Sequence, residues 1–269
     1  MFKPLTRILP SSSASKDKLS HAFENVSRGV GFVAIALPIG CLLAALIGLI
    51  PPDDIQNSIS HFYYIPIMGD FFVGCLFFNG ILLMFMFHTN GRPVTGWSRL
   101  SSTESFFMRF AGFAAIMIAV FPTQGPSDSY GDTELLRVFV EGKAGTAVFD
   151  VGALGWIADF SWHYIFAISM FVVLAYFTTF VFTRDHTTER DETPSTPTPN
   201  KLRRNRRYRF LGASIIASIL LIGIGKTSWF GMVEQWDAYN GTFIFEGIAL
   251  LAFGFAWLIK GRLFQSLND

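Results

Sequence analysis

Ionisable side chains occur at the ends of several long apolar segments of this chain, where an unpaired charge is costly. Asp70 and Glu246 are carboxylates near one end of two such segments, and His163 lies near the start of a third. An acid or a histidine in a membrane segment usually faces the protein interior or a water-filled cavity and has a partner. We therefore expect these three side chains to share one polar pocket.

The predicted pocket has further members near the same segment ends. Lys226 would pair with Asp70 or Glu246, and one of the two carboxylates would orient His163 by accepting a hydrogen bond from its ring. Asp159 lies four residues before His163, so the two share one face of a helix. The full set predicted for the polar pocket is Ser60, His61, Asp70, Asp159, His163, Lys226 and Glu246.

Four interpretations of this set stay open at this point. The groups would pair with one another to fix helix packing, would bind a lipid headgroup or a partner helix, or would relay protons in a small transporter. In the fourth, His61, Asp70 and His163 hold zinc, and Glu246 is the base for the metal-bound water of a hydrolase. Zinc is the cofactor of that interpretation alone, and the chain has no H-E-x-x-H pair to support it.

The composition indicates an integral membrane protein. Of the 269 residues, 51% are hydrophobic, 16% are aromatic and 15% are charged, whereas soluble domains carry about 25% charge. The two cysteines, Cys41 and Cys75, lie inside apolar runs and are typical of buried small side chains. A disulfide framework or a zinc finger is therefore not expected.

Six apolar segments are long enough, with their flanks, to cross a bilayer core, which needs about 20 residues. We predict an all-α bundle of six transmembrane helices in a membrane domain of residues 26–260, with cytoplasmic tails at 1–25 and 261–269. The predicted spans are residues 26–50, 65–87, 106–121, 160–182, 210–225 and 243–259. Trp257 with Lys260 is typical of an anchor at the membrane interface.

Lysines and arginines alternate between rich and poor connections, which predicts that both termini are cytoplasmic. The connection of residues 51–64 has no base, whereas residues 184–209 end in the basic block Lys201–Arg209. This connection is rich in Thr, Pro and charge, so we expect it to be disordered. The basic block would set topology or contact anionic lipids, and nucleic-acid binding is not expected.

The predicted outer loop, residues 122–159, is long for a connection without structure of its own. It contains apolar stretches interrupted by glycines. A short hairpin, a half-buried lid and an interfacial helix all fit this pattern.

Motifs on most spans resemble an uncharacterised family of bacterial polytopic membrane proteins. The motifs are Ser58-Ile59-Ser60, Tyr63-Tyr64, Asp70-Phe71-Phe72-Val73-Gly74, Phe121-Pro122-Thr123, His163-Tyr164 with Ala167, Glu246, and Phe253 through Gly261. The resemblance implies a multi-pass protein of a bacterial inner (plasma) membrane, with the lipid bilayer as its partner. It implies no activity.

A fainter similarity concerns the Ser, His and Asp residues around the second span. These are similar to CREST-type membrane hydrolases, which include alkaline ceramidases and adiponectin-receptor-like proteins. That similarity implies the zinc hydrolase described above. The family has seven spans and a His-x-x-x-His pair in the last, whereas this chain has six predicted spans and Glu246 in the last.

Overall fold

A computed structural model of the chain describes residues 12–49, 56–65, 67–87, 100–121, 123, 134–137, 140–143, 148–149, 162–184, 197–227 and 231–268. Six of its helices are long and apolar enough to cross a membrane. They are α1 (Ser12–Leu46), α2 (Met68–Phe85), α3 (Ser102–Val120), α4 (Trp162–Tyr176) with the π-helical turn η4 (Phe177–Val181), α5 (Pro199–Gly225) and α7 (Gly241–Lys260). The predicted six-span helical membrane bundle is confirmed.

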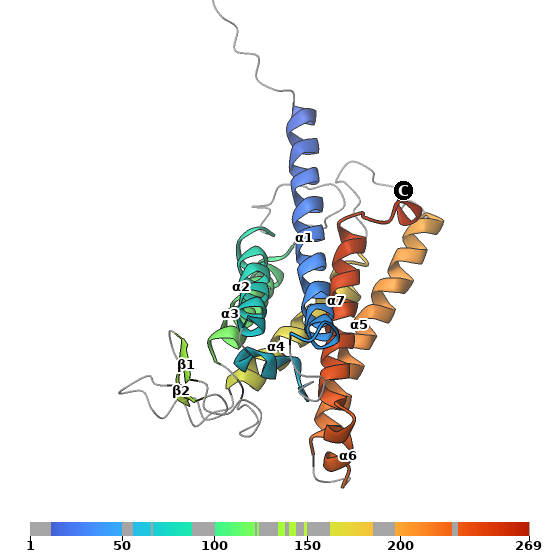
Figure 1. Cartoon of the computed structure of the whole chain (residues 1–269). Helices are drawn as coiled ribbons and strands as arrows, with labels where there is room; N and C mark the ends of the chain where they lie inside the picture. The colour runs from blue at the N-terminus through green and yellow to red at the C-terminus, as the bar shows by residue number, and fades with distance from the viewer. Residues whose placement is uncertain are drawn as a thin grey trace, which may run out of the picture.

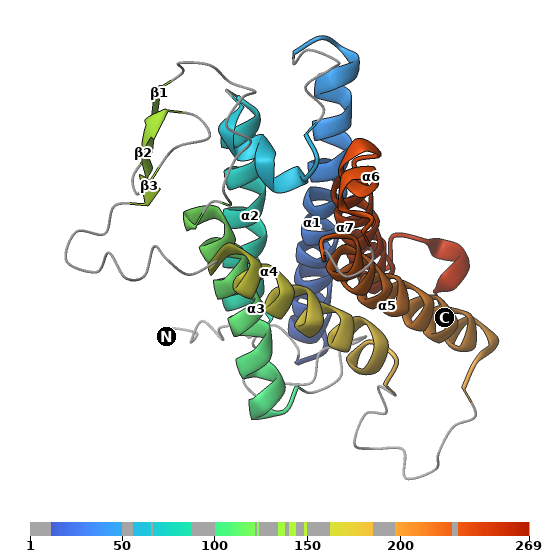
Figure 2. The same cartoon turned by 90° about the horizontal axis from the view of Figure 1, so that it is seen from below.

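The six spans form a closed ring (Figures 1 and 2). Each span packs against its neighbours in the chain, and α7 returns to pack against α1. The ring has two ends. The end where α1 begins and α7 finishes is called the terminal end, and the opposite end carries α6 (Val233–Ala238) and a short 3-10 helix, η2 (Ile59–Tyr64). This second end is called the η2 end.

Glycines permit close backbone approach at two helix crossings. A Cβ atom at Gly80 of α2 would lie 2.8 Å from the carbonyl oxygen of Gly112 on α3, and a Cβ at Gly112 would lie 2.5 Å from the carbonyl oxygen of Gly80. Gly31 of α1 and Gly254 of α7 face each other in the same way. A Cβ atom added at either residue would lie 2.8 Å from the carbonyl oxygen of the other. Small residues at these crossings let helix backbones approach, which is how spans associate in lipid.

Aromatic side chains fill the terminal end of the ring. The indole of Trp257 is fully buried, with ring centroids of Phe87, Phe182 and Phe253 at 4.6, 5.3 and 5.8 Å. The ammonium of Lys260 lies 5.1 Å from the Phe182 ring centroid, and its side chain is also buried. The prediction that Trp257 and Lys260 anchor the interface is therefore wrong, because α7 turns this face toward the other helices.

Two helices begin earlier than hydropathy predicts, because polar residues cap them. Ser101 and Glu104 form a reciprocal capping box, so α3 starts at Ser102 and not near residue 106. The Thr198 hydroxyl accepts from the Lys201 amide and Pro199 is in the first turn, so α5 includes the whole basic block. The predicted disorder of residues 184–209 is thus wrong for 199–209, and residues 185–196 lie outside the described part.

The predicted outer loop contains a small antiparallel sheet. Strands β1 (Glu134–Arg137), β2 (Val140–Lys143) and β3 (Val148–Phe149) are neighbours in that order. Glu134 pairs with Lys143, and Val140 pairs with both Arg137 and Phe149. The short hairpin is therefore the form that this loop takes in its described strands.

Candidate functional site

The segment 58–64 is a short 3-10 helix held at the η2 end by its own cap. The Ser58 hydroxyl accepts a hydrogen bond from the Ser60 amide at 3.1 Å, and the His61 amide donates to the Ser58 carbonyl at 3.1 Å. Ile59, Phe62, Tyr63 and Tyr64 are all buried. A serine cap and four buried apolar or aromatic side chains thus fix a turn that carries two hydroxyls, Ser58 and Ser60.

Glu246 of α7 binds this turn from one side. Its carboxylate accepts from the Ser58 hydroxyl at 2.8 and 3.0 Å and from the Ile59 amide at 2.7 Å. The Phe243 amide, one turn earlier in α7, donates to the Asn57 carbonyl at 2.8 Å. Together these contacts tie the turn to α7.

His163 of α4 binds the same turn from the other side. Its Nδ1 lies 2.8 Å from the Phe121 carbonyl oxygen, and its Nε2 lies 2.8 Å from the Ser60 Oγ. A carbonyl oxygen only accepts, so in the neutral ring Nδ1 carries the proton and Nε2 presents its lone pair. The Ser60 hydroxyl then donates to Nε2. Ser58, Ile59, Ser60, His163 and Glu246 are together called the η2 network.

A second set of contacts joins α4 to the same segment beside the network. The Tyr64 hydroxyl donates to the Thr123 carbonyl, and the Thr123 hydroxyl donates to the Tyr164 hydroxyl at 3.1 Å. The rings of Phe121, Trp162 and Phe166 lie against one another, with centroids 5.9 to 6.2 Å apart. Phe121, whose carbonyl orients His163, is therefore itself held by an aromatic cluster.

The structure brings Ser60, His163 and, through Ser58, Glu246 together on one turn. It separates two other members. Lys226 forms an ion pair with Asp237 of α6, 2.7 Å from Nζ to Oδ1, and not with Asp70 or Glu246. Asp70 is exposed in the first turn of α2, where a carboxylate complements the helix dipole. Asp159 lies outside the described residues.

His61 lies beside the network without joining its hydrogen bonds. Its Nδ1 atom is buried, and it has no hydrogen-bond partner in the part of the chain that the structure describes. Burial lowers the pKa of His61 to about 4, and the positive charge of Lys226 acts in the same direction. The ring is therefore neutral at physiological pH.

The zinc site predicted from His61, Asp70 and His163 is not assembled. Within the described ranges, no group of three or more His, Cys, Asp or Glu side chains could hold a metal ion. The hydrogen bonds of His163 also explain this, because both of its ring nitrogens already contact Phe121 and Ser60. Glu246, the predicted base, likewise binds Ser58 and Ile59.

Two residues of polar clusters were missed by the sequence prediction. Ser58 joins Glu246 to the turn, and the S-x-S spacing of Ser58 and Ser60 is the signal that would have indicated it. Glu104, at the terminal end, accepts from Arg184 at 2.5 Å and from the Tyr176 hydroxyl at 3.3 Å. The bond to Glu104 raises the pKa of Arg184. The capping pattern S-x-x-E marks Glu104 but not its ion pair.

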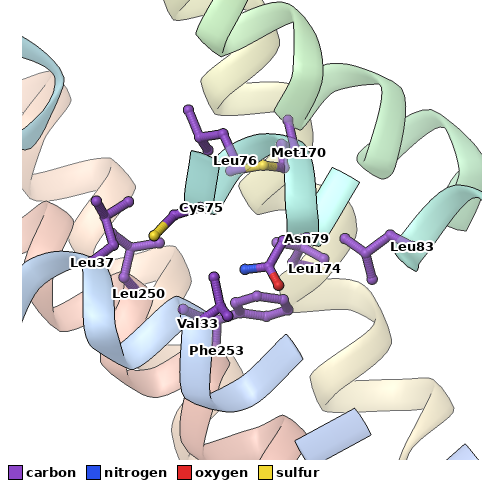
Figure 3. Close-up of a pocket in the computed structure, with 12 residues that line it drawn as sticks. Val33, Leu37, Cys75, Leu76, Asn79, Leu83, Met170, Leu174, Leu250 and Phe253 are labelled. Carbon is purple, nitrogen blue, oxygen red and sulfur yellow. The ribbon is translucent and has the colours of Figure 1, made fainter. Parts of the chain in front are cut away.

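A small cavity lies inside the ring, away from the η2 network. Its volume is about 20 Å³, enough for one water molecule and no larger solute. Figure 3 shows Asn79 extending from α2 toward Val33, Leu174 and Phe253. The Asn79 Oδ1 atom is buried and has no partner among the described residues, so it is the polar group that a water here would satisfy.

Comparisons of the chain with family models, with curated proteins and with solved structures find no match. The geometry of the η2 network therefore carries the functional argument. A serine hydroxyl, a histidine with a free lone pair toward it and a third group that orients the histidine form the arrangement of an activated nucleophile and its base.

Proposed function

We propose that Ser60 and His163 are the nucleophile and general base of an acyl-transfer site at the outer face of a bacterial inner membrane. The single observation behind this proposal is the 2.8 Å contact from Ser60 Oγ to His163 Nε2, with Nδ1 bonded to the Phe121 carbonyl. The carbonyl sets the tautomer that the base needs. In a catalytic triad, a carboxylate performs that task.

In the proposed reaction, Ser60 Oγ attacks the carbonyl carbon of an ester or amide, and its proton moves to His163 Nε2. The tetrahedral intermediate collapses when the bond to the leaving alcohol or amine breaks, and that group takes the proton from Nε2. Water then attacks the acyl-serine, gives one proton to Nε2, and releases the acid as Ser60 regains that proton. The sum is ester or amide plus water giving acid plus alcohol or amine.

The position of the site favours an amphiphilic substrate. The η2 network lies at the end of a membrane bundle, next to the aromatic cluster of Phe121, Trp162 and Phe166. Tyr164 and Ile165, on the same turn of α4 as His163, are exposed to the surroundings of the bundle. Aromatic residues at this depth are typical of contact with lipid headgroups and the adjoining acyl chains. A lipid ester or amide is the substrate class that we propose.

The charge distribution supports an orientation with the η2 end outside. Among the described helices and their caps, the η2 end carries Lys226 alone. The terminal end carries Arg28, Arg184, Lys201, Arg203, Arg204, Arg206, Arg207, Arg209, Lys260 and Arg262. By the positive-inside rule, this asymmetry supports the proposal that both termini are cytoplasmic. A reporter that works only in the cytoplasm should be active when it is fused after Asp269. Activity of a periplasmic reporter at the same position would contradict this orientation.

The activity is tested with a fluorophosphonate probe, which reacts irreversibly with an activated serine. The purified parent should be labelled. The Ser60→Ala and His163→Ala variants should react with the probe at least about a hundredfold more slowly. Ser214→Ala is the matched control, because Ser214 is a partly exposed serine of α5 bonded to its own helix. Labelling of Ser60→Ala at the parental rate, or no labelling of a folded parent, would refute the proposal.

A second candidate function is favoured by the Glu246 contacts. The carboxylate binds both Ser58 and Ile59, so the network would serve as a clasp that holds the turn while the bundle binds a lipid or a partner helix without covalent chemistry. Under this alternative, Glu246→Gln and Ser60→Ala lower thermal stability alike, and no acyl probe reacts. Ser60→Cys separates the two functions, since a thiol retains nucleophilic reactivity while weakening the hydrogen bond to His163.

A further inference from the structure

Helix α5 is longer than the membrane requires. Its apolar part begins near Phe210, and the helix starts at Pro199, so its first turns extend roughly 16 Å beyond the apolar core. The whole helix is about 40 Å long, against a hydrocarbon thickness of about 30 Å. The basic block of residues 201–209 therefore lies at the depth of the lipid headgroups of the leaflet at the terminal end.

One face of this extension is exposed and rich in arginine. At 3.6 residues per turn, the exposed side chains occupy an arc of roughly 160° around the helix. They are Leu202, Arg203, Arg206, Arg207, Arg209 and Phe210. This set is called the arginine face. Leu202 is 55% exposed and Phe210 is 71% exposed, so two large apolar side chains interrupt the four guanidinium groups.

The opposite face of the extension is fixed to the rest of the protein. Arg204 donates to the Leu267 carbonyl at 2.6 Å, and Asn200 donates to the Asn268 carbonyl at 2.8 Å. Asn205 donates to the Thr183 carbonyl at 3.1 Å, and Tyr208 is buried. The helix turns that carry the arginine face are thus ordered before any ligand binds, which reduces the entropy that binding must offset.

No acid within the described residues neutralises the arginine face. None of its four arginines forms an ion pair there, whereas Glu24 and Glu104, the acids whose side chains are described at this end of the ring, already have partners. Glu104 pairs with Arg184 at 2.5 Å, and Glu24 lies 3.6 Å from Arg262 and 3.9 Å from Arg28. Four closely spaced positive charges at headgroup depth attract phosphate, and guanidinium groups bind it in a bidentate manner.

We infer that the arginine face binds the phosphate groups of anionic phospholipids in the leaflet at the terminal end, with Leu202 and Phe210 against their acyl chains. Two exposed apolar side chains among the arginines suit a lipid better than a nucleic acid, which would leave them in water. This inference concerns the opposite end of the ring from Ser60 and His163. It stands whether or not those residues react.

The test uses the full chain in lipid nanodiscs or mixed micelles, with phosphatidylglycerol titrated into phosphatidylcholine and bound lipid counted by native mass spectrometry. We expect the quadruple variant with Arg203, Arg206, Arg207 and Arg209 changed to Gln to need at least about tenfold more phosphatidylglycerol for equal retention, since each base near the surface contributes roughly fivefold. The quadruple Arg→Lys variant is the matched control. It keeps the charge and should lose much less.

Three outcomes would overturn the inference. Equal retention by the Gln variant and the parent would show that the lipid binds elsewhere. Displacement of phosphatidylglycerol by millimolar inorganic phosphate, or by a single-stranded oligonucleotide at equal charge, would assign the face to a soluble phosphate or to nucleic acid. A lower melting temperature of the Gln variant in lipid-free detergent, with unchanged lipid retention, would assign it to an intramolecular partner such as the acid-rich segment before α5.

Discussion

The two ends of the ring hold their polar side chains in different ways. At the η2 end, Glu246 and His163 both bind one short turn through hydroxyl and amide groups, and the paired residues are 188 and 103 positions apart in the chain. At the terminal end, Glu104 pairs with the cation of Arg184, and Glu24 lies near Arg28 and Arg262. The η2 network depends on neutral donors, whereas these contacts at the terminal end depend on opposite charges; the ion pair of Lys226 and Asp237 at the η2 end lies outside the network.

This difference has a consequence for function. Hydrogen bonds between buried groups are little affected by salt, whereas pairs with an exposed partner are screened. The Arg184 side chain is 40% exposed, and the Glu104 side chain is 6% exposed. We therefore expect the hydrogen bonds of the η2 network to be insensitive to salt, which would suit the proposed acyl-transfer site. We expect the contacts at the terminal end to change with salt, which would suit the proposed contact with charged lipid.

The largest expected effect is that of Glu246→Ala, which leaves the Ser58 hydroxyl and the Ile59 amide without their acceptor. We expect a loss of about 3 kcal/mol in the free energy of unfolding, because each buried donor left without an acceptor costs about 1–3 kcal/mol. Thermal unfolding in detergent measures it, and 1 M salt should not change the loss. Glu234→Ala, an exposed acid of α6, is the control and should have no effect.

The next effect concerns pH and the His61 side chain. The pKa of His61 is about 4 in the folded protein, below the ordinary 6.5. Its contribution to stability is therefore complete above pH 6.5 and is lost as the pH falls toward 4, by about 2 kcal/mol at pH 5. His61→Gln should remove this part of the acid destabilisation. An unchanged pH profile in that variant would show that His61 is accessible to protons without unfolding.

A smaller effect is expected from Glu104→Gln at the terminal end. Because Arg184 is partly exposed, the pair is screened, and we expect a loss of about 1–2 kcal/mol. In contrast to Glu246→Ala, the loss should shrink in 1 M salt. The double variant with Arg184→Gln measures the coupling. If salt affected both ends equally, the contrast between them would be wrong.

The smallest effect compares two tyrosines of the η2 end. Tyr64→Phe removes a buried hydroxyl that donates to the Thr123 carbonyl, which should cost about 1 kcal/mol. Tyr164→Phe removes a bond of a 55% exposed residue and should cost less than half of that. Both variants should keep Ser60 reactive toward the fluorophosphonate probe. Equal losses would indicate that Tyr164 is buried in the membrane-embedded protein.

The helices of this protein could be predicted because they follow from local properties. A run of apolar residues long enough to cross the bilayer must form a helix there, since no water satisfies its backbone groups. Helix ends were predicted less well where a cap decided them, as Ser101 does for α3 and Thr198 does for α5. Hydropathy does not register a cap, although the S-x-x-E pattern of residues 101–104 does.

The members of the candidate site were only partly predictable, for a different reason. The cost of burying a polar side chain is enough to mark Glu246 and His163 as groups that need partners. It does not say which partners, and Asp70, Lys226, Ser58 and Ser60 were all at the same predicted depth. The rotation of α4 and α7 about their axes selects Ser60 and Ser58. The rotation of α7 also turns Trp257 into the core, and the orientation of α2 leaves Asp70 exposed.

The sequence by itself determined that the chain has six apolar spans and that acids and histidines gather near one end of them, because span length and side-chain polarity are properties of short segments. Tertiary structure alone decided that a serine pair, and not Asp70, joins Glu246 to His163. It also decided that the Phe121 carbonyl sets the tautomer of His163. Contacts between residues more than a hundred positions apart depend on how whole helices are rotated and packed, and no short segment contains that information.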